Sequence, residues 1–194
     1  MCTAPTHRVS SIAPSPDRSS AAANRYRLAV WMMLALLVIG AASPADTERL
    51  ADPLVLARLV PVRWQELHLL AEKEFGRRQI AQLQISYARA DYVSTDNSRE
   101  ADIEVIDTLH SPMHYNEFEF DRSNAPADRI TILALPFGSG YLVQDFAEEQ
   151  TRVRMLFKNR YLVKIQQSPI VDAVTMHQAI TAWLALPDVH DVFK

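Results

Sequence analysis

The feature that most restricts the fold is a pair of alternating segments within residues 151–167, which read TRVRMLFKNRYLVKIQQ. Alternation of apolar and polar residues is typical of a strand with one buried face. Lys158-Asn159-Arg160 separates the two segments, and asparagine tolerates the left-handed backbone of a tight turn. The pattern therefore predicts a β-hairpin in an antiparallel sheet, with its apolar face made by Val153, Met155, Phe157, Tyr161, Val163 and Ile165.

The rest of the chain predicts further strands over 79–92, 101–108, 129–135 and 141–146. Ile106 lies on the otherwise polar side of its strand, which indicates that part of this side is covered. Residues 62–70 fit either a short strand or a helix. Segment 95–98, Thr-Asp-Asn-Ser, has the composition of a turn.

Helices are predicted at both ends of this region. Residues 46–59 form the first, with Asp52 as its cap, and Pro61 follows it. The last helix is capped by Asp172, ends at Pro187, and carries an apolar stripe of Met176, Ala179, Ile180, Trp183 and Leu184. We expect an α+β fold: a single antiparallel sheet of about five to six strands, with helices packed on one face and the C-terminal helix closing the domain.

The first 45 residues have a different character. Residues 1–24 are rich in Ser, Ala and Pro, and are predicted to be a disordered polar extension. Residues 25–45 place Arg25 and Arg27 before an apolar run over 28–42 and small residues after it, which is the order of a signal peptide cleaved after Ala45. An uncleaved signal anchor is the alternative, although the run is shorter than the roughly 20 residues of a usual span. Either reading predicts a periplasmic or other extracytoplasmic domain over 46–194, attached to the inner membrane only through 28–42 if that run is retained.

Cysteine and charge exclude several functions. The only cysteine is Cys2, so residues 46–194 contain no disulfide, thiolate ligand or cysteine nucleophile. Without the four arginines and one aspartate of the first 45 residues, 16 basic and 22 acidic residues remain, a net charge of −6. An acidic domain repels phosphate backbones, so nucleic acid and anionic lipid surfaces are not expected partners.

Motifs of known chemistry are lacking in the sequence. Gly138-Ser139-Gly140 matches neither a phosphate-binding loop nor the Gly-x-Ser-x-Gly elbow of serine hydrolases, and indicates a turn. The carboxylates Asp102 and Glu104 are interpreted as solvated charge on a strand face rather than a glycosidase pair.

Several landmarks together resemble a loose group of bacterial exported α+β proteins of unknown function. They are ARLVPVRW, ISYARADY, ADIEVIDT, VRMLFKNRYLVKIQ and AWLALP, in this order, within residues 54–187. The resemblance implies an exported α+β domain, but no activity and no catalytic residue. The chain departs from the group at SPMHYNEFEF, which replaces a helix of small residues.

Residues 107–120, DTLHSPMHYNEFEF, hold the candidate site. His110, His114 and nearby carboxylates could ligate a metal. However, Pro112 could occupy only the first turn of a helix, which leaves His110 outside it, and there is no His-Glu-x-x-His motif. We expect an irregular polar segment that contacts a partner through His110, His114, Tyr115 and Glu117, with no metal, cofactor or catalytic residue.

Two classes of function follow. The sequence favours a non-catalytic envelope domain that binds a protein or a small molecule, of which a periplasmic inhibitor or immunity protein is a narrower form. The alternative is a periplasmic metal-assisted hydrolase with its site near His110 and His114. An enzyme should bring both imidazoles and a carboxylate into one pocket.

Overall fold

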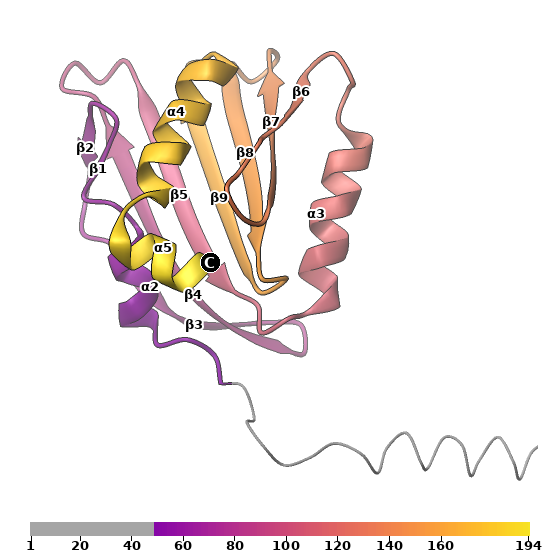
Figure 1. The fold of residues 1–194 in the computed structure, drawn as a ribbon. Coiled ribbons are helices and arrows are strands. Elements are labelled where there is room, and N and C mark those ends of the chain that lie inside the picture. Colours follow the sequence, from indigo (N-terminus) through magenta and orange to yellow (C-terminus); the bar gives the residue numbers. More distant parts are fainter. Residues whose placement is uncertain (1–48) are drawn as a thin grey trace, which may run out of the picture. The chain divides into compact units, whose positions relative to one another are not determined.

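The computed structural model describes residues 49–194 (Figure 1). Its elements follow one another as α2 (Pro53–Leu59), β1 (Arg63–Trp64), β2 (Leu67–Leu69), β3 (Glu74–Ile80), β4 (Leu83–Val93), β5 (Glu100–Asp107), α3 (Pro112–Asn124), β6 (Ile130–Ile132), β7 (Ser139–Asp145), β8 (Gln150–Phe157), β9 (Tyr161–Ser168), α4 (Ala173–Leu184) and α5 (Pro187–Phe193). The predicted signal peptide or anchor over 25–45 lies outside the described residues.

All strands belong to one antiparallel sheet with the order β1-β2-β4-β5-β9-β8-β7-β6, and β3 also pairs with β4. The α+β class is confirmed, but the sheet has nine strands rather than five or six. The additional strands are β1, β2 and β3. The first two are too short to show alternation, and the segment predicted as one strand over 79–92 is divided by a turn at Ala81, whose φ is 53°.

The predicted hairpin over 151–167 is confirmed as β8 and β9. Lys158 and Asn159 both take left-handed backbone angles, with φ of 53° and 50°, as a tight hairpin turn requires. Because β9 also pairs with β5, this hairpin lies beside the centre of the sheet. Its apolar face therefore becomes part of the main core.

That core lies between one face of the sheet and helices α2, α4 and α5. Both predicted caps form: Asp52 accepts a hydrogen bond from the Leu54 amide, and Asp172 accepts one from the Thr175 amide, each at 2.9 Å. Met176, Ile180, Trp183 and Leu184 are buried as the helical stripe predicts. Pro187 starts α5 rather than ending the helical region, because proline is well suited to a first helical turn.

The opposite face carries α3, which corrects the prediction that all helices pack on one side. Phe118 of α3 is buried against a second apolar cluster, which consists of Ile85, Ile106, Tyr141, Leu156 and Leu162. Ile106 faces this cluster while its neighbour Val105 faces the main core, so the two clusters lie on opposite sides of the sheet. The prediction that Ile106 is covered is confirmed.

The segment predicted to be irregular is the helix α3. Pro112 occupies the first turn of α3, Ser111 precedes it, and His110 lies outside the helix. The prediction that proline leaves His110 outside a helix is therefore confirmed, whereas the prediction of an irregular segment is wrong. Among residues 49–194, no helix is long and apolar enough to cross a membrane.

Candidate functional site

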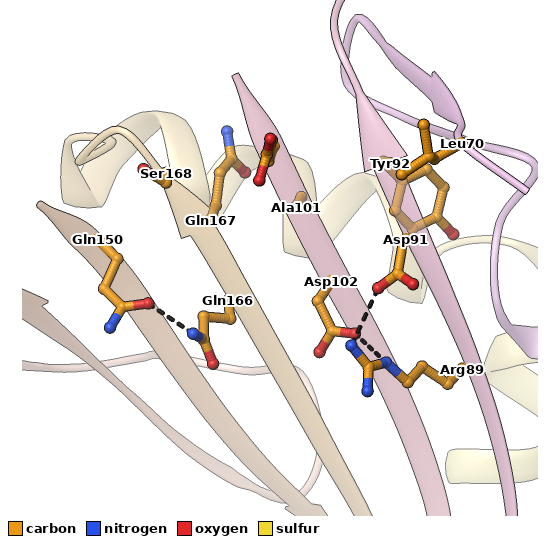
Figure 2. Close-up of a pocket in the computed structure, with 11 residues that line it drawn as sticks. Leu70, Arg89, Asp91, Tyr92, Ala101, Asp102, Gln150, Gln166, Gln167 and Ser168 are labelled. Carbon is orange, nitrogen blue, oxygen red and sulfur yellow. Dashed lines mark hydrogen bonds and ion pairs between the residues drawn. The ribbon is translucent and has the colours of Figure 1, made fainter. Parts of the chain in front are cut away.

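A polar cavity lies on the α3 side of the sheet, at the end where β4 and β9 finish and β5 and β8 begin. It has a volume of about 360 Å³ and opens to solvent. Figure 2 shows its lining, in which Asp91 on β4 stands directly opposite Asp102 on β5. Three carboxylates (Asp91, Glu100 and Asp102) and one guanidinium (Arg89) give the cavity a net negative charge.

The two paired aspartates are held together by Arg89. Its Nε donates to Asp102 Oδ2 at 2.5 Å, and its Nη2 donates to Asp91 Oδ1 at 3.1 Å. The two carboxylates thus share one guanidinium, as the dashed lines in Figure 2 show.

The surroundings of Asp102 favour its protonated form. Burial raises the pKa of Asp102 to about 6, the charge of Arg89 opposes this rise, and the neighbouring Asp91 side chain adds to it. The Asp102 side chain is only 29% exposed. The pair therefore carries one proton in mildly acidic solution and loses it near neutral pH.

Amide groups complete the opposite side of the cavity. Gln166 on β9 donates from Nε2 to Gln150 Oε1 on β8 at 2.5 Å, and Gln150 donates to Glu148. Gln150 is buried, so its amide is held in place, whereas Gln166 is exposed. The cavity thus presents carboxylate acceptors on one side and amide groups on the other, which suits a ligand that bears an ammonium or guanidinium group.

Asp102 should make the stability of the domain depend on pH. Its pKa in the folded protein is above the usual 3.8, so between about pH 4 and 6 the folded state holds a proton that the unfolded state releases. Stability should therefore fall as pH rises through this window. With a discount for partial exposure, Asp102→Asn should raise the free energy of unfolding at pH 7 by about 1–2 kcal/mol and have a smaller effect at pH 4.5.

Urea unfolding of Asp102→Asn, of the wild type and of Glu72→Gln at both pH values measures this difference. Glu72 is exposed and outside the cavity, so its variant controls for the loss of one negative charge. A variant at Asp102 that is less stable than the wild type at pH 7 would contradict the raised pKa.

The residues singled out in 107–120 do not meet in one pocket. His110 lies in the turn before α3 and lines a different cavity, at the other end of β4 and β5. His114 belongs to α3 and is buried; its Nδ1 lies 3.3 Å from Glu117 Oε2, and Glu117 also accepts from Lys164 at 3.3 Å. Tyr115 is 44% exposed. Their role in partner contact stays a prediction.

The arrangement that metal-assisted hydrolysis would need is not found in residues 49–194. No group of three or more His, Cys, Asp or Glu side chains there could hold a metal ion. The buried His114 reaches Glu117 but not the cavity that His110 lines. The geometry thus offers no common pocket for the two imidazoles and a carboxylate.

The aspartate pair is not evident from the sequence, because Asp102 has the pattern of solvated charge on a strand face. One signal points to it: the turn over 95–98 lies between the two predicted strands that carry Asp91 and Asp102. A hairpin register places such residues opposite each other, which would have identified the pair.

Comparison with protein-family models, with curated proteins and with solved structures found no match to this chain. The resemblance to exported α+β proteins therefore stays a prediction, and the candidate function depends on the geometry alone.

Proposed function

We propose that this protein is a non-catalytic binding domain of the bacterial cell envelope, whose partner presents a cationic group to Asp91 and Asp102. The partner is a protein with a lysine or arginine side chain at the contact, or a small molecule with an amine. The observation that carries this proposal is the cross-strand aspartate pair in an open polar cavity.

Such a pair is costly for the domain alone. Like charges directly opposite each other destabilise a sheet, and burial of Asp102 adds to this cost. Arg89 compensates only part of it, because one guanidinium is shared between two carboxylates. A second cation from a partner would neutralise the remaining charge and favour loss of the proton from Asp102.

The part of the sheet that α3 leaves uncovered also supports a partner site at the aspartate pair. Helix α3 covers the apolar stretch of this face around Ile106 and Leu162. The polar stretch around Asp91, Asp102 and Gln166 has its own cavity and no helix among its lining residues. A partner could therefore reach these side chains without any rearrangement of the domain.

Export is the second part of the proposal. It is supported by the sequence order of arginines, apolar run and small residues over 25–45. Amino-terminal sequencing of the protein from fractionated cells tests it. A first residue of Asp46 in the periplasmic fraction, or an intact amino terminus in the membrane fraction, agrees with export, whereas an intact chain in the cytoplasm contradicts it.

Affinity capture from envelope extracts tests the binding role. We expect the tagged protein to retain one stoichiometric partner, and Asp91→Asn/Asp102→Asn to lose it because the cation would meet no carboxylate. The matched control is Glu72→Gln/Asp188→Asn, which changes the net charge equally at exposed positions outside the cavity. Equal recovery of the partner by both double variants would contradict the proposed site.

A further inference from the structure

A second cavity, of about 550 Å³, lies at the opposite end of β4 and β5 from the aspartate pair. It is lined by the start of β4, by Arg77 of β3, by Arg49 and by the turn over 108–112 that leads into α3. Among residues 49–194, no acidic residue lines it, although residues 46–194 carry a net charge of −6. The charge of this cavity is thus opposite to that of the domain.

The positive charge of this cavity comes from two arginines. Neither Arg49 nor Arg77 forms a side-chain ion pair with the described residues, and Arg77 is exposed. Asp107 directly precedes the turn over 108–112 that lines the cavity. Its carboxylate is fully buried and already accepts hydrogen bonds from Arg160 at 2.7 and 2.8 Å. The positive charge of the cavity is therefore available to a ligand.

The cavity also contains the N-terminal end of α3, a helix of 13 residues. The first-turn amide of Met113 has no acceptor within the helix, and the helix dipole adds partial positive charge there. Ser111 precedes the helix, yet its hydroxyl caps no amide. This side chain is 6% exposed, and its Oγ has no hydrogen-bond partner among residues 49–194.

A buried hydroxyl without a partner normally costs about 1–3 kcal/mol, so it needs a physical explanation. We propose that this cavity binds a phosphate group, with Arg49 and Arg77 neutralising its charge while Ser111 Oγ and the Met113 amide donate hydrogen bonds to its oxygens. Helix N-termini and arginines are the donors that phosphate groups commonly use. His110 lines the same cavity and contributes to its rim.

The phosphate could belong to a small phosphorylated molecule or to a phospholipid headgroup. The purified protein is titrated with inorganic phosphate, with acetate, and with vesicles of phosphatidylcholine containing or lacking phosphatidylglycerol. We expect phosphate to shift the amide resonances of 109–111, 113 and 114, and to bind more tightly than acetate. Arg77→Gln should weaken binding about tenfold, the usual effect of losing one charge-assisted contact.

Arg58→Gln is the matched control, because Arg58 is an exposed arginine of α2 that does not line the cavity. Ser111→Ala provides a second test that leaves the charge unchanged and should also weaken phosphate binding. Binding of inorganic phosphate assigns the site to small phosphorylated molecules. Binding only to phosphatidylglycerol vesicles assigns the site to lipid headgroups. In either case Arg77→Gln must weaken the binding more than Arg58→Gln does.

Three results would overturn this proposal: no binding of phosphate or vesicles up to about 10 mM total phosphate, equal effects of Arg77→Gln and Arg58→Gln, or acetate binding as tight as phosphate binding. None of them bears on the aspartate cavity, which lies at the other end of the strands.

Discussion

Replacing Asp107 by alanine is expected to lower the free energy of unfolding by about 3–5 kcal/mol, because it breaks a buried ion pair. Asp107 is fully buried and accepts from both Nε and Nη2 of Arg160. It also accepts from the amides of Ala51 at 2.6 Å and Leu109 at 3.0 Å. The variant would leave a guanidinium and two amides without this acceptor. This one carboxylate connects the chain before α2, the end of β5 and the hairpin.

The matched comparison is Glu66→Ala, which breaks the pair between Arg99 Nη2 and Glu66 Oε2 at 2.8 Å. That pair has a similar length, but its side chains are 39% and 80% exposed. Its loss should cost less than about 1 kcal/mol. Urea unfolding of both variants measures the difference, when the curves are fitted with one common slope of unfolding free energy against urea concentration. Similar losses of unfolding free energy in the two variants would mean that burial does not strengthen the contribution of Asp107 to stability.

Replacing Phe193 by alanine is expected to cost about 3–5 kcal/mol, the usual range for a buried aromatic side chain. Phe193 of α5 is 1% exposed and stacks on Phe157 of β8, with ring centroids 4.4 Å apart and an interplanar angle of 6°. It also meets Trp183 edge-on, with centroids 5.8 Å apart. The ring thus joins α5, α4 and the sheet, and its removal would leave a cavity among Phe157, Tyr161 and Trp183.

Thermal and urea unfolding of Phe193→Ala, with Asp191→Ala as a control on the exposed side of α5, measures this contribution. The control should change stability by less than about 0.5 kcal/mol. A loss below about 1 kcal/mol for Phe193→Ala would show that α5 does not pack on the core in solution.

The sequence predicted those parts of the fold that local chemistry determines. Alternation identified the hairpin of β8 and β9, and the caps Asp52 and Asp172 marked the starts of α2 and α4. Ile106 even indicated that the second face is covered. Which helix covers it depends on tertiary packing, and α3 has too few regularly spaced apolar residues to be recognised before its partner surface is known.

The candidate site was harder to predict for a related reason. Histidines attract attention in any sequence, but His114 is a buried residue of α3 and His110 lines a separate cavity. Asp91 and Asp102 look like ordinary surface charge until the register of β4 and β5 places them opposite each other. Their interaction depends on strand pairing and on partial burial, and neither can be predicted from the sequence pattern of one strand.

Binding of a cationic group to the aspartate pair can be measured by titrating the protein with an acetylated tetralysine peptide while amide resonances are followed at pH 7 and pH 5. We predict shifts concentrated at 89–91, 100–102, 150 and 166. With a pKa of about 6, protonation of Asp102 should weaken binding about tenfold at pH 5, and Asp91→Asn/Asp102→Asn should abolish these shifts. Unchanged binding by that double variant, or shifts located elsewhere on the domain, would contradict the account.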